Sequence, residues 1–178
     1  MARHIALLRG VNIGPRNRVA MPKLRELLEG AGFDAVRTYV QSGNVVLSSS
    51  AKEADIARSC KQAIAEGFGL DIDVVVRTRA ALAKVVDRNP LGKIAVDPKR
   101  YQVSFLSAKP SREILRKLEA VATEAERVVA SGREIYAWHP DGAARSKLWA
   151  LLAGRQLGVT ATARNWTTVT KLVELAND

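Results

Sequence analysis

Residues 36–47 read Val36-Arg37-Thr38-Tyr39-Val40-Gln41-Ser42-Gly43-Asn44-Val45-Val46-Leu47. Residues 36–40 and 45–47 have the residue types of β-strands, and Ser42-Gly43-Asn44 between them is typical of a tight turn. The segment therefore predicts a β-hairpin. The elements expected on either side of this hairpin decide which fold contains it.

The hairpin is flanked by a strand and a helix on each side. Upstream, residues 5–8 are a short apolar strand, and residues 21–28 have apolar side chains at helical spacing. Downstream, residues 54–68 form a second apolar helical stripe, and residues 72–76 form another strand. The resulting order, β-α-β-β-α-β, is typical of a ferredoxin-like plait.

The second half of the chain repeats this order without repeating the residues. We expect strands at 101–106, 127–130, 134–138 and 159–163, with helices at 111–121 and 145–152. A helix near 80–86 lies in the connector, and a further helix is expected at 167–176. The sequence predicts an α+β protein of two tandem ferredoxin-like plaits, 1–78 and 101–178, joined by a helical linker at 79–100.

The composition is that of a globular protein, with 47% hydrophobic and 26% charged residues among 178. The single cysteine, Cys60, cannot form an internal disulfide, and its place in an apolar helical run predicts a packed thiol. No apolar run is long enough for a signal-peptide core or a membrane span. We therefore expect a cytoplasmic location and no membrane partner.

The surplus positive charge is confined to two windows of the chain. Residues 1–25 contain six arginines and lysines and no acid, and residues 142–173 contain five and no acid. The region between them has nearly balanced charges, although the formal net charge of the whole chain is +10. This segregation predicts an anion site assembled from the two windows.

The expected winding of each plait brings polar loops together. Right-handed crossovers place residues 9–12 near residues 41–44 in the first plait, and residues 139–147 near residues 164–166 in the second. Arginine side chains and backbone amides in such loops are suited to phosphate or carboxylate. The candidate anion-binding residues are Arg9, Gly10, Asn12, Gln41, Ser42, Gly43, Asn44, Arg145, Ser146, Lys147, Arg164, Asn165 and Trp166.

Arg145 and Lys147 are expected in the opening turn of a helix, where the macrodipole disfavours cations and a bound anion would remove the conflict. Each candidate also has a structural interpretation. The glycines suit tight turns, residues 41–44 suit hairpin capping, Asn165 suits a helix cap and Trp166 suits an anchor between domains. Asp141 is an alternative countercharge for the cations. The sequence leaves these alternatives open.

Several segments together resemble one known family. They are Leu8-Arg9-Gly10-Val11-Asn12-Ile13-Gly14, Met21-Pro22-Lys23-Leu24-Arg25, Thr38-Tyr39-Val40-Gln41-Ser42-Gly43-Asn44-Val45-Val46, Asp141-Gly142 through Arg145-Ser146-Lys147-Leu148, and Ala163-Arg164-Asn165-Trp166-Thr167-Thr168-Val169. In order and spacing, they resemble the domain of unknown function 1697 family. The resemblance implies two successive α/β plaits in an uncharacterised bacterial protein, and it implies no particular activity.

No motif in the chain predicts a metal site, a cofactor or a recognisable reaction. The two histidines and one cysteine have no ligand spacing, and residues 10–14 lack the Lys-Ser/Thr ending of a phosphate loop. Plait proteins that bind RNA stack bases on aromatic rings of the sheet, and residues of that type are Tyr101, Phe105, Tyr136 and Trp138. Packing of one plait on the other is the alternative use of these rings.

Three hypotheses follow. The first is a non-catalytic module that binds an anionic ligand, either a nucleic acid or a phosphorylated small molecule, through the basic loops. The second is an enzyme acting on a phosphate- or carboxylate-bearing substrate, with Arg9, Arg145 and Arg164 as clamps and Lys147 or His139 in proton transfer. The third is purely structural, with the polar clusters docking the two plaits. The sequence does not predict an oligomeric state.

Overall fold

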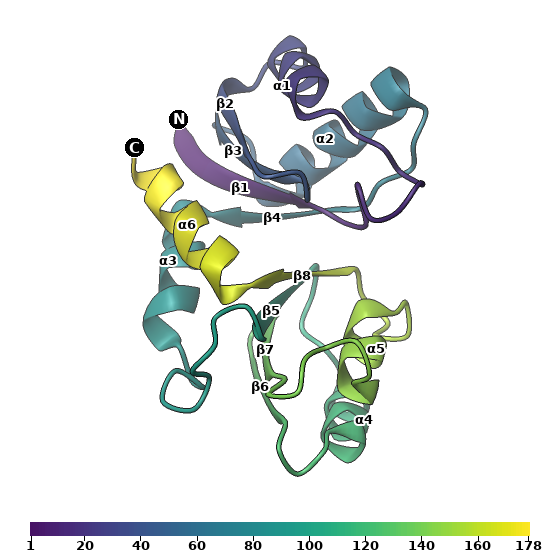
Figure 1. Cartoon of the computed structure of the whole chain (residues 1–178). Helices are drawn as coiled ribbons and strands as arrows, with labels where there is room; N and C mark the ends of the chain where they lie inside the picture. Colours follow the sequence, from purple (N-terminus) through teal and green to yellow (C-terminus); the bar gives the residue numbers. More distant parts are fainter. The chain divides into compact units, whose positions relative to one another are not determined.

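The computed structural model describes residues 1–178 as an α+β protein with two four-stranded antiparallel sheets and six helices (Figure 1). The chain divides into two compact units. Unit 1 consists of residues 1–84 and 172–178, and unit 2 consists of residues 85–171. Two helices, α3 (Arg79–Arg88) and α6 (Trp166–Asn177), each have one part in unit 1 and one part in unit 2.

Unit 1 contains the first sheet and the two helices that cover it. Its elements are β1 (Ala2–Leu8), α1 (Met21–Gly30), β2 (Asp34–Tyr39), β3 (Asn44–Ser49), α2 (Glu53–Phe68) and β4 (Val74–Thr78). The strand order is β2-β3-β1-β4, and every neighbouring pair is antiparallel. The helices α1 and α2 lie against one face of this sheet (Figure 1).

Unit 2 repeats the arrangement with elements that are no longer than their counterparts in unit 1. Its sheet and helices are β5 (Tyr101–Leu106), α4 (Arg112–Val121), β6 (Arg127–Ser131), β7 (Glu134–Trp138), α5 (Lys147–Ala153) and β8 (Ala161–Asn165). The strand order is β6-β7-β5-β8, again antiparallel throughout. The helices α4 and α5 pack on one face of the sheet, with Leu118 and Leu148 buried against Leu106 and Ile135.

The core of unit 1 follows from apolar side chains at helical and strand spacing. Met21, Leu24 and Leu28 form one stripe of α1 and are buried against the helix-facing side chains of the sheet. Cys60 of α2 lies in the same core, where burial raises the pKa of its thiol to about 12. A thiol in that state is an unreactive packing residue. The longest helix, α2, has 16 residues, and no helix of the chain could span a bilayer.

The element order predicted from the sequence is confirmed, but two strand ends are wrong in the same way. The predicted strand 72–76 is β4 at 74–78, and the predicted strand 159–163 is β8 at 161–165. Each prediction ended before an arginine, Arg77 or Arg164, that instead lies inside the strand. Each guanidinium has a hydrogen-bond acceptor within its own strand, because Nη1 donates to the carbonyl oxygen of the preceding residue.

The predicted start of the helix at Arg145 is also wrong. The helix α5 begins at Lys147, and Ser146 is its N-cap, with Oγ accepting from the backbone N–H of Trp149 at 3.0 Å. Serine is among the favoured N-cap residues because its side chain satisfies one of the free amides of the first turn. Arg145 therefore lies before the helix, in the connection from β7.

Candidate functional site

The two candidate loops of unit 1 meet, as the sequence predicted. The side-chain nitrogen of Asn12 donates to the carbonyl oxygens of Gln41 at 2.6 Å and Val19 at 2.9 Å. The backbone N–H of Val19 donates back to Asn12 Oδ1 at 2.9 Å. The amide of Asn12 is thus occupied in holding the connection 9–20 against the β2–β3 hairpin.

The hairpin itself is closely packed on β1. Gly43 has a φ of +80°, and a Cβ added there would lie 2.6 Å from the Cβ of Leu8. The N–H of Leu8 donates to the carbonyl oxygen of Gly43 at 2.9 Å. Asn44 is fully buried, and its Nδ2 donates to Tyr39 O at 3.1 Å and Ser42 Oγ at 2.9 Å. These are the contacts expected of hairpin capping.

The remaining candidates of unit 1 lie around this junction. Arg9 is half-buried, and its backbone N–H donates to the carbonyl oxygen of Asp73 at 2.9 Å. Gly10, Gln41 and Ser42 are exposed. The structure therefore gathers the predicted residues of unit 1 at one end of the sheet, with the side-chain amides of the two asparagines turned toward the backbone.

In unit 2, Arg164 does not share a pocket with Arg145. Arg164 is only 7% exposed, and its Nη1 donates to Thr162 Oγ1 at 2.7 Å and to Ala163 O at 2.8 Å. Burial lowers its pKa to about 10. Arg145 is exposed and lies in a different connection. An arginine that is held this way is a structural part of β8.

The two neighbours of Arg164 also have structural contacts. Asn165 Oδ1 accepts from the backbone N–H of Thr168 at 2.9 Å and so caps the start of α6. The ring of Trp166 stacks on Tyr101, with centroids 4.7 Å apart. The segments 139–147 and 164–166 do lie at one end of the sheet, because β7 and β8 both pair with the start of β5. Residues 98–100 lie between them, bonded to the backbone N–H groups of His139 and Trp166.

A buried polar cluster holds the Arg145-Ser146-Lys147 segment in place. Ser146 Oγ donates to Glu126 Oε2 at 2.5 Å, and His139 Nδ1 lies 2.6 Å from the same oxygen. The other carboxylate oxygen, Oε1, accepts from the backbone N–H of Thr123 at 3.2 Å. Glu126 is 7% exposed and His139 is 1% exposed. Both carboxylate oxygens of this buried residue, Glu126, therefore have hydrogen-bond partners.

The charge of Glu126 is maintained by its hydrogen bonds. Burial alone would raise the pKa of this carboxyl, but the donors from Ser146, His139 and Thr123 together outweigh burial and lower the pKa below its ordinary value of 4.5. At neutral pH the group is a carboxylate. Its negative charge lines the same hollow as Arg145.

The cluster differs from the triad of serine hydrolases. In that arrangement the serine hydroxyl bonds one imidazole nitrogen and the acid bonds the other. Here the nitrogen nearest to Ser146 Oγ, at 3.3 Å, is His139 Nδ1, the same nitrogen that bonds Glu126. His139 Nε2 is buried without a hydrogen-bond partner. The Ser146 hydroxyl donates to a carboxylate and caps α5, which makes it an anchor for the segment.

The anchored segment places one cation at each of two hollows on unit 2. Arg145 lines a hollow of about 340 Å³ together with Thr123, Glu126, Asp141, Gly142 and Ser146. Lys147 lines a groove of about 510 Å³ between α4 and α5. Both side chains are exposed, and neither makes an ion pair or a hydrogen bond. The first hollow also contains acids, whereas the second contains none.

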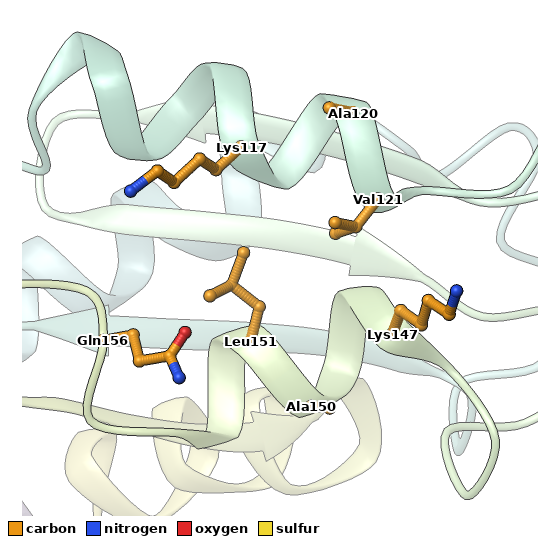
Figure 2. A pocket seen from close by; sticks show the side chains of 7 residues that line it. All are labelled: Lys117, Ala120, Val121, Lys147, Ala150, Leu151 and Gln156. Carbon is orange, nitrogen blue, oxygen red and sulfur yellow. The ribbon is translucent and has the colours of Figure 1, made fainter.

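Figure 2 shows how the groove between α4 and α5 is built. Val121 of α4 and Leu151 of α5 point toward each other and form an apolar floor, with Lys117 on one side of them and Lys147 on the other. Lys117 pairs with Glu113 at 3.1 Å, but both side chains are more than half exposed. Such a surface pair contributes little and exchanges readily.

Sequence reasoning missed two residues of this region, Glu126 and Lys117. A usable signal existed for Glu126, because Thr123 and Glu126 have the spacing of a capping box and do bond each other's backbone N–H groups. No pattern in the sequence connects Lys117 with Lys147. These two residues become neighbours of one groove only through the packing of α4 on α5.

Comparisons with known proteins identify the family without suggesting an activity. A family model described as protein of unknown function (DUF1697) matches residues 1–136. Among solved structures, the conserved bacterial protein SP0830 from Streptococcus pneumoniae has a similar fold. The TM-score is 0.79 and the sequence identity 20%, with 98% of each chain covered. A comparison with curated proteins found no match.

Proposed function

The chain belongs to the DUF1697 family, and on that premise we propose that it is a binding protein for an anionic small molecule, without a catalytic role. The binding site is the groove between α4 and α5, where the anionic group binds Lys147 at one end and the apolar body of the ligand extends over Val121 and Leu151 toward Lys117 at the other end (Figure 2). The observation that supports this most is the absence of any countercharge on the exposed Lys147 in a groove lined by no acid.

The shape and lining of the groove favour a ligand with an apolar body. A volume of about 510 Å³ is within the range of small-molecule sites. Ala120, Val121, Ala150 and Leu151 give the groove an apolar lining, and burial of carbon on them adds roughly 25 cal/mol for each Å² removed from water. The ligand class is therefore a phosphate or carboxylate attached to a hydrocarbon or aromatic body.

A small molecule is favoured over a nucleic acid because the rings that could stack bases are covered. Tyr101, Phe105, Tyr136 and Trp138 are all buried. The hydroxyl of Tyr136 donates to the carbonyl oxygen of Val85 at 2.9 Å. Base stacking on the sheet of unit 2 would require this packing to open.

Two broader features belong to the same proposal. We infer that each unit is a ferredoxin-like plait, because the βαββαβ order and the strand order β2-β3-β1-β4 agree with that fold. We also propose a cytoplasmic location, because a single buried thiol suits a reducing compartment.

Isothermal titration with hexyl phosphate tests the binding site. We expect saturable binding, weakened by about tenfold or more when Lys117→Ala and Lys147→Ala remove both cations. The matched control is Lys93→Ala with Lys99→Ala, which removes the same charge from exposed lysines outside the groove. Leu151→Ala is expected to weaken hexyl phosphate more than inorganic phosphate.

Two outcomes would overturn the proposal. One is the lack of saturable binding, or equal loss in the groove variant and its control. The other is tight binding of a short RNA or DNA that is unaffected by the groove variant and falls by about a thousandfold or more between about 50 and about 200 mM salt. That second result would show that the basic surface of the protein binds nucleic acid.

A further inference from the structure

Another cavity with positive lining lies in unit 1, and none of the candidate anion-binding residues named from the sequence lines it. Its volume is about 300 Å³, and it is lined by Met1, Ala2, Arg3, Thr78, Arg79 and Ala80. These residues come from the start of β1 and from the junction of β4 with α3. The lining includes two arginines and no acid.

Arg3 has an unsatisfied donor at this cavity. Its Nη1 is buried from solvent and has no hydrogen-bond partner, although the side chain as a whole is half-buried. Buried polar nitrogens in native proteins nearly always have a partner, and a guanidinium without one is costly. Arg3 lines the cavity, and its unpartnered donor indicates a missing acceptor.

Arg79 supplies the second cation. Its side chain is exposed, and its only bond is from Nη1 to the neutral Oδ1 of Asn177 at 3.2 Å. The first turn of α3, which Arg79 opens, contains no acidic residue. A positive side chain at that place is disfavoured by the helix macrodipole. The carboxylate of Glu53, whose Oε1 accepts from the backbone N–H of Thr78 at 3.1 Å, offsets only part of this cost because it is a single charge beside two arginines.

We propose that this cavity binds a phosphate group, either inorganic phosphate or the phosphoryl group of a small ester. Guanidinium groups donate two parallel hydrogen bonds to phosphate oxygens, and two arginines on one cavity wall can bind three oxygens at once. The acceptor satisfies Arg3 Nη1 and neutralises Arg79. The site shares no residue with the groove between α4 and α5, so it stands independently of the function proposed above.

Isothermal titration with inorganic phosphate and with ethyl phosphate tests the site, using protein without an N-terminal tag because Met1 and Ala2 line the cavity. We expect Arg3→Gln and Arg79→Gln each to weaken binding by about tenfold. Arg16→Gln, which removes an exposed arginine elsewhere in unit 1, leaves the affinity unchanged. Binding of ethyl phosphate equal to that of phosphate indicates an ester as ligand, and binding of phosphate alone indicates the free ion.

An NMR readout keeps the test decisive if Arg3→Gln fails to fold. Addition of inorganic phosphate to the wild-type protein is expected to shift the side-chain Nε–H resonances of Arg3 and Arg79 and the backbone amide of Ala80. The Arg79→Gln variant loses these shifts, whereas the Lys117→Ala, Lys147→Ala double variant keeps them. The proposal is wrong if phosphate shifts resonances of α4 and α5 only, or if Arg16→Gln weakens binding as much as Arg79→Gln.

Discussion

The two units have the same order of elements but lengthen different connections. In unit 1, residues 9–20 follow the first strand and only residues 50–52 follow the third. In unit 2, residues 107–111 follow the first strand and residues 139–146 follow the third. The first and third strands of each sheet are antiparallel, so their C-terminal ends lie at opposite ends of that sheet. The long connection of unit 1 therefore lies at the sheet end that corresponds to the short connection in unit 2.

The long connections are also held by different chemistry. Asn12 holds the connection of unit 1 with neutral amide bonds to backbone groups. Glu126 holds the connection of unit 2 with a buried carboxylate bonded to Ser146 and His139. In unit 1 the Asn12 amide bonds join the connection to its own residue Val19 and to the hairpin. In unit 2 the Glu126 carboxylate holds the Ser146 side chain, and the neighbouring Arg145 and Lys147 side chains remain exposed to solvent.

The largest expected effect is the loss of the charged anchor. Glu126→Ala leaves the buried ring of His139 and the hydroxyl of Ser146 without their shared acceptor, and is expected to lower the free energy of unfolding by about 3 kcal/mol. Urea denaturation measures this loss. Glu124→Ala, which removes an exposed carboxylate two residues away, is the control and is expected to change little. A loss of less than about 0.5 kcal/mol would show that the cluster does not hold the connection.

The closed junction of unit 1 is tested by Gly43→Ala. The substitution combines a positive φ with a Cβ placed 2.6 Å from Leu8 Cβ and 2.7 Å from Val11 Cγ2. We expect a loss of about 2 kcal/mol in thermal or urea denaturation. Gly14→Ala separates the two causes, because Gly14 has a φ of +67° and open space around it. Gly14→Ala is expected to cost only about 1 kcal/mol, and equal losses would contradict the close packing of the hairpin.

Loss of the neutral anchor is expected to have a smaller effect. Asn12→Ala removes the bonds to Gln41 and Val19, and the bond to Gln41 lies at an exposed place where water can replace it. We expect a loss of about 1 kcal/mol in urea denaturation, together with faster hydrogen exchange of residues 9–20. Unchanged exchange in that segment would show that Asn12 does not hold it.

The smallest expected effect is a difference in how the two anchors change the pH dependence of the free energy of unfolding. The hydrogen bonds that lower the pKa of Glu126 in the folded state stabilise the protein fully above the ordinary carboxyl value of 4.5. That contribution is lost as the pH falls below 4.5 through the lower pKa of the folded state. Glu126→Gln should therefore lose less stability on acidification than the wild type. Asn12→Ala should lose as much stability on acidification as the wild type does. Parallel curves for all three proteins would contradict the charged state of Glu126.

Local sequence patterns predicted most of the fold because they reflect side-chain burial. The apolar run 45–47 and the helical stripe of Met21, Leu24 and Leu28 are all buried in the structure. The strand ends at Arg77 and Arg164 were missed because a cation in a strand resembles a boundary. Only the three-dimensional structure shows that each guanidinium bonds the carbonyl of the residue before it.

The candidate site was less predictable because its parts are distant in the sequence. Ser146 and Lys147 were found from the segment itself. The acid that holds Ser146 lies 20 residues earlier, at Glu126, and joins it only when β6 and the β7–α5 connection pack together. Arg164 was assigned to the same site by loop geometry, whereas its side chain is buried and bonds Thr162.

Backbone amide shifts on titration with hexyl phosphate test most directly whether the cations displayed by unit 2 form a binding site. The structure predicts saturable shifts at Lys117, Val121, Lys147, Leu151 and Gln156, which line one groove, and their disappearance in the Lys117→Ala, Lys147→Ala double variant. Shifts that are scattered over exposed lysines such as Lys93, or that persist unchanged in the double variant, would contradict it.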